Sequence, residues 1–228
     1  MIGIRLLIDT SKCIGCKSCQ VACQQWHSLP PEDTVFAGTY QNPPDMSGAN
    51  LTVTKFIETK DTKLNWLFFK DQCRHCNEPP CMKHCPFRAI IRQADGIVRI
   101  DPAKCFPIRC SRDEVKPCQD ECKFDEIPRY KYIKGGKLVI TQMRKCDLCY
   151  DRFNNPTLNA QSKKPACQMA CPPGAISFGN ADLILKEARN RVSSLKTRGF
   201  PDAKVYPGDS THIIWVLTKG ESQYGQED

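Results

Sequence analysis

Short apolar or alternating segments recur along the chain, and each stands a few residues before a group of cysteines. They occupy residues 4–8, 66–69, 97–100 and 138–140. Segments of this length and residue type predict short strands that lead the chain into loops. The pattern therefore predicts a repeated unit in which one strand is followed by one cysteine-rich loop.

A second element recurs after the cysteine groups. Cys85-Pro-Phe-Arg-Ala-Ile and Cys171-Pro-Pro-Gly-Ala-Ile share a proline and an Ala-Ile pair, and Cys122-Lys-Phe-Asp-Glu-Ile-Pro is a weaker copy. The proline ends the preceding helical turn. We expect the Ala-Ile pair to begin a strand.

Turn signals predict two hairpins, and strand-like segments predict a third. Asp95-Gly96 separates residues 90–92 from 97–100, and Gly135-Gly136 separates residues 130–133 from 138–140. Both dipeptides are typical of tight hairpin turns. Residues 52–57 and 66–69 are expected to pair as a third hairpin within a proline-containing insertion, residues 24–72.

The end of the chain has a different pattern. Residues 181–198 predict an amphipathic helix with Ile184, Ala188, Val192 and Leu195 on one face, and residues 211–217 predict a strand. Packing is the expected role of this helix, and docking onto a partner is the alternative. Because no apolar run approaches the eighteen or so residues that cross a bilayer, we expect no direct membrane insertion.

Composition indicates the chemistry of these loops, because the 228 residues include sixteen cysteines in four groups of four. The first group, with spacing x2-x2-x3, is the run that bacterial-type ferredoxins use for 4Fe–4S clusters. The groups are Cys13-x2-Cys16-x2-Cys19-x3-Cys23, Cys73-x2-Cys76-x4-Cys81-x3-Cys85, Cys105-x4-Cys110-x7-Cys118-x3-Cys122 and Cys146-x2-Cys149-x17-Cys167-x3-Cys171. We interpret them as ligands of four 4Fe–4S clusters.

Two other cysteine chemistries fit the pattern less well. Disulfides need an oxidising compartment that is normally reached through a signal peptide, and residues 1–9 have neither a basic start nor a cleavage site. Zinc sites use two well-separated Cys-x-x-Cys pairs. The first group instead places four thiols within one short loop.

The formal charge of +8 suggests nucleic acid as a ligand, but it counts every cysteine as neutral. Four thiolates around an oxidised core of about +2 leave about −2 per cluster, so four clusters contribute about −8. We therefore interpret the basic surplus as internal compensation. Clustered basic and aromatic stretches are also missing, and we expect no nucleic-acid binding.

The ferredoxin rule predicts specific ligand sets. In two-cluster ferredoxins the fourth cysteine of a group ligates the other cluster, so two groups interlock. Pairing group one with four and group two with three predicts a first set of Cys13, Cys16, Cys19 and Cys171; a second of Cys23, Cys146, Cys149 and Cys167; a third of Cys73, Cys76, Cys81 and Cys122; and a fourth of Cys85, Cys105, Cys110 and Cys118. The x4 and x7 gaps make the fourth set the least regular, and loss of its cluster is the alternative.

These observations predict an α+β fold of two tandem ferredoxin-like units, each with two clusters. Residues 1–23 and 141–180 form the first unit, and residues 73–140 form the second. Residues 24–72 are the hairpin-containing insertion, and residues 181–228 supply the C-terminal helix and strand.

Other polar residues are less informative. Lys12, Lys104 and Lys145 each precede the first cysteine of a group. We expect solvated lysines at strand ends, with a rise in cluster potential as the alternative. The four histidines are not needed as ligands: His27, His75, His84 and His212. Nothing resembles a nucleophile–base pair, a phosphate-binding glycine loop or a flavin site, so we expect no substrate chemistry in this protein.

Motifs around the cysteines resemble a known family. They are Cys13-Ile-Gly-Cys-Lys-Ser-Cys-Gln-Val-Ala-Cys23, Gln41-Asn42-Pro43-Pro44-Asp45, Trp66-Leu-Phe-Phe-Lys-Asp-Gln-Cys-Arg-His-Cys76, Lys145-Cys-Asp-Leu-Cys-Tyr-Asp-Arg152, Pro165-Ala-Cys167 and Lys196-Thr-Arg-Gly199. The cysteine pattern is similar to that of the iron–sulfur subunits of the dimethyl sulfoxide reductase superfamily. The motifs resemble the beta subunit of formate dehydrogenase within it.

This resemblance implies an electron-transfer subunit bound to a large catalytic subunit with a molybdenum- or tungsten-pterin cofactor. That partner would oxidise formate or run the reverse reaction, and electrons would continue to a cytochrome or another acceptor. The sequence departs from membrane-anchored members, which add a C-terminal transmembrane helix, so we expect a soluble complex. We expect it in the periplasm, exported with a signal-bearing partner, with a cytoplasmic complex as the alternative.

Two alternative functions stay open at this stage. The same role could serve a catalytic subunit for nitrate, thiosulfate, polysulfide or a sulfoxide. A free polyferredoxin is the other alternative, against which the insertion and the segment after residue 180 argue.

Overall fold

The computed structural model describes residues 3–60, 64–124, 127–159 and 162–226. In sequence order its elements are β1 (Ile4–Asp9), α1 (Ser18–Trp26), β2 (Thr52–Lys60), β3 (Leu64–Gln72), α2 (Pro80–Lys83), β4 (Ile90–Arg92), β5 (Val98–Ile100), α3 (Pro107–Cys110), α4 (Pro117–Asp120), β6 (Arg129–Lys134), β7 (Lys137–Arg144), α5 (Tyr150–Phe153), α6 (Ala166–Met169), β8 (Ile176–Asn180), α7 (Ala181–Thr197), β9 (Lys204–Tyr206), β10 (Ile213–Leu217) and the 3-10 helix η1 (Glu221–Tyr224).

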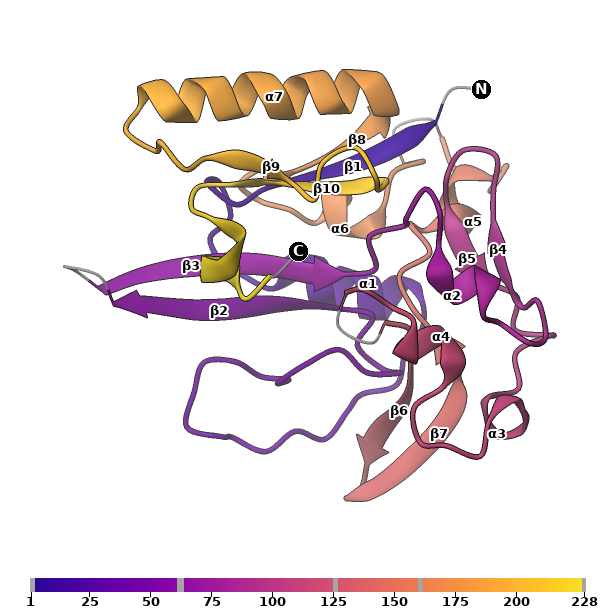
Figure 1. Ribbon diagram of the computed structural model, residues 1–228. Helices are drawn as coiled ribbons and strands as arrows, with labels where there is room; N and C mark the ends of the chain where they lie inside the picture. Colours follow the sequence, from indigo (N-terminus) through magenta and orange to yellow (C-terminus); the bar gives the residue numbers. More distant parts are fainter. Residues whose placement is uncertain (1–2, 61–63, 125–126, 160–161, 227–228) are drawn as a thin grey trace.

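A four-stranded sheet in the order β8-β1-β10-β9 lies between α7 and the β2–β3 hairpin (Figure 1). Strand β1 pairs antiparallel with β8 and parallel with β10. Because side chains alternate between the faces of a strand, Leu6 and Ile8 pack toward the hairpin while Leu7 packs toward α7. One strand therefore contributes to two apolar cores.

Strand β10 explains the short apolar run near the end of the sequence. Ile213, Trp215 and Leu217 join the core on the hairpin side, and Ile214 and Val216 join the core under α7. All five side chains are fully buried. A strand covered on both faces has a continuous apolar sequence rather than an alternating one.

Helix α7 has the length and the apolar face that the sequence predicts. Ile184, Ala188 and Leu195 are buried against the sheet, and Val192 is partly buried beside them. The helix begins after Asn180, whose side-chain oxygen accepts hydrogen bonds from the backbone N–H groups of Asp182 (3.0 Å) and Leu183 (3.1 Å). This N-cap satisfies two donors at the helix start that have no partner within the helix.

All three predicted hairpins are confirmed. Strands β2 and β3, β4 and β5, and β6 and β7 pair antiparallel. The β2–β3 hairpin packs on the sheet through Phe69, whose ring stacks on Trp215 with centroids 5.0 Å apart.

The strands also link the cysteine groups. The strand after each of three groups pairs with the strand before another one: β4 with β5, β6 with β7, and β8 with β1. The ends of different cysteine loops are thereby held side by side. Within the described ranges, no helix is long and apolar enough to cross a membrane.

Candidate functional site: four sets of cysteines

Short helices place the third cysteine of each group. Cys19 and Cys23 lie on α1, which packs against α6 with Cys167. Cys81 on α2 and Cys118 on α4 are placed in the same way by contact between these two helices. Group one therefore meets group four, and group two meets group three.

In three Cys-x-x-Cys loops, the residue directly before the second cysteine has a left-handed backbone conformation. Gly15 (φ 67°), His75 (φ 51°) and Leu148 (φ 55°) each precede the second cysteine of a pair. Positive φ is uncommon for residues other than glycine, so the repetition marks a shared loop geometry. The third group lacks this loop, and Cys110 instead ends the one-turn helix α3.

The first two predicted sets are each brought together. After burial, electrostatic interaction with Cys19, Cys171 and Cys16 raises the pKa of Cys13. Interaction with Cys146 and Cys167 acts in the same direction on the pKa of Cys23 and on that of Cys149. Cys16 is exposed, whereas Cys23, Cys149 and Cys167 are buried.

The third and fourth predicted sets line two small apolar cavities. Cys73, Cys76, Cys81 and Cys122 line one, which is partly open to solvent. Cys85, Cys105, Cys110 and Cys118 line the other, which is also partly open. The irregular third group therefore converges with Cys85, despite its spacing.

A buried lysine organises the long gap in the third group. The Nζ atom of Lys116 donates to the backbone oxygens of Ser111 (3.1 Å) and Asp113 (2.5 Å), which closes the loop before α4. The N–H of Lys116 donates to Gln119 Oε1 at 3.1 Å, which fixes the start of the helix with Cys118. Sequence spacing gave no sign of this closure.

Backbone N–H groups point at cysteine sulfurs. The N–H of Ala89 donates to Cys85 Sγ, and that of Ala175 donates to Cys171 Sγ, both at 3.3 Å. These two alanines belong to the repeated Pro-x-x-Ala-Ile element, which thus positions a donor as well as starting a strand. Such donors favour an anionic sulfur over a thiol.

Crowding makes free thiolates unfavourable at these positions. Burial, followed by neighbouring cysteines, raises the pKa of Cys13 to about 11 and that of Cys76 to about 12. The pKa of Cys81 is also raised to about 12. Thiolates packed this closely need a cationic centre among them, and iron supplies it. The sets therefore fit 4Fe–4S clusters, each with four sulfur ligands.

Two buried lysines lie among the cysteines. Lys12 and Lys104 are exposed beside Asp9 and Asp101, as expected. The expectation was wrong for Lys145, which is buried because its side chain turns inward and donates to backbone oxygens. Lys70 is also buried, although the preceding residues Trp66–Phe69 indicate only a strand and give no sign of a buried charge.

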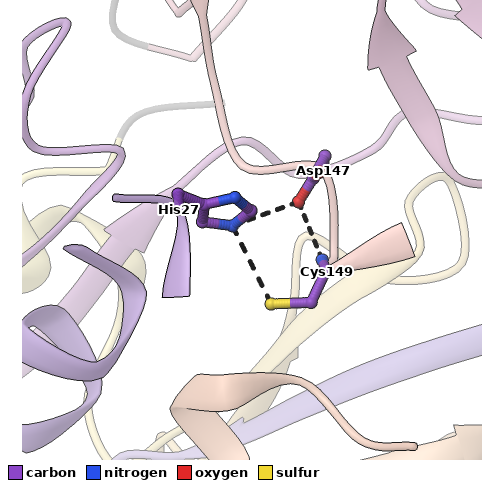
Figure 2. Close-up of side chains that lie close together, drawn as sticks. All are labelled: His27, Asp147 and Cys149. Atoms are coloured by element: carbon purple, nitrogen blue, oxygen red, sulfur yellow. Dashed lines mark hydrogen bonds and ion pairs between the residues drawn. The ribbon is translucent and has the colours of Figure 1, made fainter. Parts of the chain in front are cut away.

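His27 lies beside the second set (Figure 2). Its Nε2 atom is 3.9 Å from Cys149 Sγ and 3.3 Å from Asp147 Oδ1. The same carboxylate oxygen accepts the N–H of Cys149 at 2.8 Å. His27 therefore contacts the predicted ligand Cys149, and such a contact orients a ligand.

Comparison with known proteins agrees with this chemistry. A 4Fe–4S dicluster domain matches residues 64–181, and a 4Fe–4S binding domain matches residues 5–25. The protein therefore binds multiple 4Fe–4S clusters.

Three relatives are informative. The protein is similar to the iron–sulfur subunit of the nitrate-inducible formate dehydrogenase of Escherichia coli, with 42% identity over 92% of this sequence and 67% of the relative. It is 34% identical to formate dehydrogenase 2 subunit beta (cytochrome c-553) of Nitratidesulfovibrio vulgaris, over 96% of this sequence and 94% of the relative. The B subunit of the anaerobic dimethyl sulfoxide reductase of Escherichia coli is 32% identical over 79% of this sequence and 75% of the relative.

Identity, coverage and the dicluster match agree with the four sets of thiols held by short helices and hairpins. The protein belongs to the family of formate dehydrogenase iron–sulfur subunits, which transfer electrons through 4Fe–4S clusters.

Proposed function

We propose that this protein binds four 4Fe–4S clusters, one in each predicted set, and passes electrons between a formate-oxidising catalytic subunit and a downstream acceptor. The observation that supports the proposal most directly is the grouping of all sixteen cysteines into four separate sets. Two of these sets line small, mainly apolar pockets.

Electrostatic interactions between sets support a linear order. Cys19 of the first set acts on Cys167 in the second. Lys145 lies near both Cys146 of the second set and Cys73 of the third. Cys81 of the third set neighbours Cys118 of the fourth. We therefore propose the order first, second, third, fourth along the path of electrons.

When bound, each 4Fe–4S centre accepts and returns one electron. The residues of the protein set the spacing of the centres and the polarity around them. Cysteines on adjacent turns of one helix, such as Cys19 and Cys23, bind neighbouring centres, and about one helical turn separates these ligands. The mainly apolar lining of the third and fourth sets supplies few mobile polar groups, and this limits the reorganisation that accompanies each change of charge.

Exposed apolar side chains border both ends of the proposed path and support partner docking. Ile14 is 58% exposed beside the first set, and Phe106 and Ile108 are 42% and 74% exposed beside the fourth. We propose that one end meets a large molybdenum- or tungsten-pterin subunit and that the other meets the acceptor. A cytochrome is the proposed acceptor, because the name of the Nitratidesulfovibrio relative includes cytochrome c-553.

We also propose that the complex works in the periplasm, following the family analogy. Fractionation of the native host into periplasm and cytoplasm tests this location. Recovery of the protein with cytoplasmic markers would contradict it.

Iron and acid-labile sulfide analysis of the purified native complex tests the cluster count. Four clusters predict about sixteen iron atoms per protein. A measured content of about twelve iron atoms would mean that the fourth set holds no cluster. Substituting Cys110→Ser should then lower the iron content of a four-cluster protein but leave that of a three-cluster protein unchanged.

Formate tests the catalytic partner. Anaerobic formate should reduce the clusters of the intact complex, as seen in its electron paramagnetic resonance spectrum, while the complex without its large subunit should respond only to dithionite. The similarity to the dimethyl sulfoxide reductase B subunit supports one alternative, a sulfoxide-reducing partner. Oxidation of reduced clusters by dimethyl sulfoxide, with no response to formate, would establish that alternative.

A further inference from the structure

Five lysine and arginine side chains are buried in the described part of the protein, and their partners differ. Arg74 pairs with the Asp71 carboxylate, while Arg5 and Lys116 are held by backbone oxygens of loops. Lys70 and Lys145 differ from these three by lying among the predicted ligands. Neither has a carboxylate within ion-pair distance among the described residues.

Lys70 lies between the first and second sets. It faces Thr54 across the β2–β3 hairpin, and its Nζ atom donates to Thr52 Oγ1 at 2.9 Å. The hydroxyl of Thr54 is 3.7 Å from Cys19 Sγ, a ligand of the first set. The sulfurs that act on Lys70 electrostatically are Cys167, Cys19, Cys146 and Cys23. One belongs to the first set and three to the second.

Lys145 lies between the second and third sets. Its Nζ atom donates to the backbone oxygens of Val98 and Cys146, the latter at 2.9 Å. The sulfurs that act on it are Cys73 and Cys81 of the third set and Cys146 of the second. Asp147 also acts on Lys145, but from beyond ion-pair distance.

An ammonium group that is removed from water needs a compensating negative charge. Thr52 and the backbone oxygens are neutral acceptors, and protonated thiols are neutral too. Four thiolates around an oxidised iron–sulfur core are anionic, and a one-electron reduction adds one more negative charge. A fixed positive charge nearby therefore stabilises the reduced state more than the oxidised state, which raises the reduction potential.

We propose that Lys70 and Lys145 are positioning residues for electron transfer, each placed between two clusters and raising the reduction potential of both. In each transfer one cluster loses one electron and its neighbour gains it, with no bond made or broken. A shared cation raises the potentials of donor and acceptor in the same direction, so it changes the difference between them less than it changes either potential. This inference rests on the proposed four-cluster assignment.

Redox titration of the purified complex, followed by electron paramagnetic resonance with chemical mediators and no formate, tests the proposal. In Lys70→Met the potentials of the first and second clusters should become more negative. In Lys145→Met those of the second and third should do so. Lys70→Arg and Lys145→Arg keep the charge and should remain near the wild type.

Lys104→Met is the matched control. Lys104 stands immediately before a first cysteine, as Lys145 does, but it is exposed beside Asp101. All four potentials should stay unchanged in this variant. Lys70→Gln, which keeps a donor toward Thr52, provides the same test should Lys70→Met bind too little iron.

Wild-type potentials in iron-replete Lys70→Met, Lys70→Gln and Lys145→Met proteins would overturn the inference. So would equal shifts in the charge-preserving arginine variants. The result is separable from the proposed function, because the titration uses no formate. A complex that does not respond to formate but shows the expected shifts would contradict only the catalytic partner.

Discussion

At the residue scale, the tightest steric requirement in the fold is at Gly96, in the turn between β4 and β5. Its φ is 95°, and a Cβ built on it would overlap the imidazole ring of His212. The Asp95-Gly96 turn was predicted from its sequence, but the packing of His212 on it was not. A contact between residues so distant in sequence leaves no local pattern.

We predict that Gly96→Ala destabilises the protein by about 3 kcal/mol or more. Positive φ costs about 1–2 kcal/mol for alanine, and overpacking adds about 1–3 kcal/mol. Gly136→Ala is the control, because Gly136 also has positive φ (70°) but no atom within 4 Å of its Cβ. Chemical denaturation of the two variants measures the difference, and equal losses of stability would contradict the steric argument.

His212 gives the fold a dependence on pH. Burial lowers the pKa of its imidazole, and Arg5 and Arg92 lower it further, whereas the hydrogen bond to the Ile4 oxygen (2.6 Å) and the Asp95 charge oppose them. The folded pKa therefore lies below the unfolded value of about 6.5. As pH falls below about 6.5, the unfolded state takes up the proton first, so the native state loses stability.

We predict that the wild type loses more denaturation free energy between pH 7.5 and pH 5.5 than His212→Gln does. Any loss of iron at low pH affects both proteins equally. The difference between their losses of unfolding free energy therefore reports the contribution of His212. Identical slopes for wild type and His212→Gln would contradict the assignment.

At the element scale, the predicted hairpins and the C-terminal helix are present because their determinants are local. A turn dipeptide between two apolar segments, or apolar residues three and four apart, can be recognised without knowing the fold. The short strand β9 and the 3-10 helix η1 were not predicted. Tyr224 of η1 is buried against Phe69 of the hairpin, a contact that no local pattern in its polar surroundings indicates.

The N-cap of α7 offers a test at this scale. We predict that Asn180→Ala costs about 1 kcal/mol, because two backbone donors lose their partner, while Asn180→Asp keeps the cap and stays close to the wild type. Thermal unfolding measures both. A larger loss in the aspartate variant than in the alanine variant would show that the cap is not the stabilising feature.

At the scale of the whole molecule, the count and spacing of the cysteines predicted binding of 4Fe–4S clusters. The burial of Lys70 and Lys145 among these cysteines is visible only in the structure. Lys145 was interpreted as an exposed lysine, since a position before a cysteine says nothing about the direction of its side chain. Lys70 was hidden within an apolar strand. The convergence of the third group also depends on Lys116 and the loop that it closes, which spacing alone does not encode.

The cores depend on iron to different degrees. Of the eight buried residues in the core around β4, β5 and α4, three are cysteines: Cys81, Cys105 and Cys118. The core under α7 contains only Leu7, Ile184, Ala188, Leu195, Ala203, Ile214 and Val216. Loss of iron therefore removes a larger share of the packing in the first core than in the second.

We predict that chelation of iron under anaerobic conditions exposes residues 73–144 to proteolysis before residues 181–217. Limited proteolysis with mass spectrometry identifies the order of cleavage, and the iron-replete protein is the control. Cleavage within α7 or β10 before cleavage within residues 73–144 would contradict the prediction that the core around β4, β5 and α4 depends more on iron.

The parallel pairing of β1 with β10 also governs the order in which the newly made protein can assemble. Cysteines 73–122 are made before β8 and β10, so the middle of the protein can receive its metal while these two strands are still missing. Strand β1 has neither of its neighbouring strands until β8 and β10 have been made. The thiols from Cys13 to Cys23, which follow β1, are therefore among the last to be enclosed.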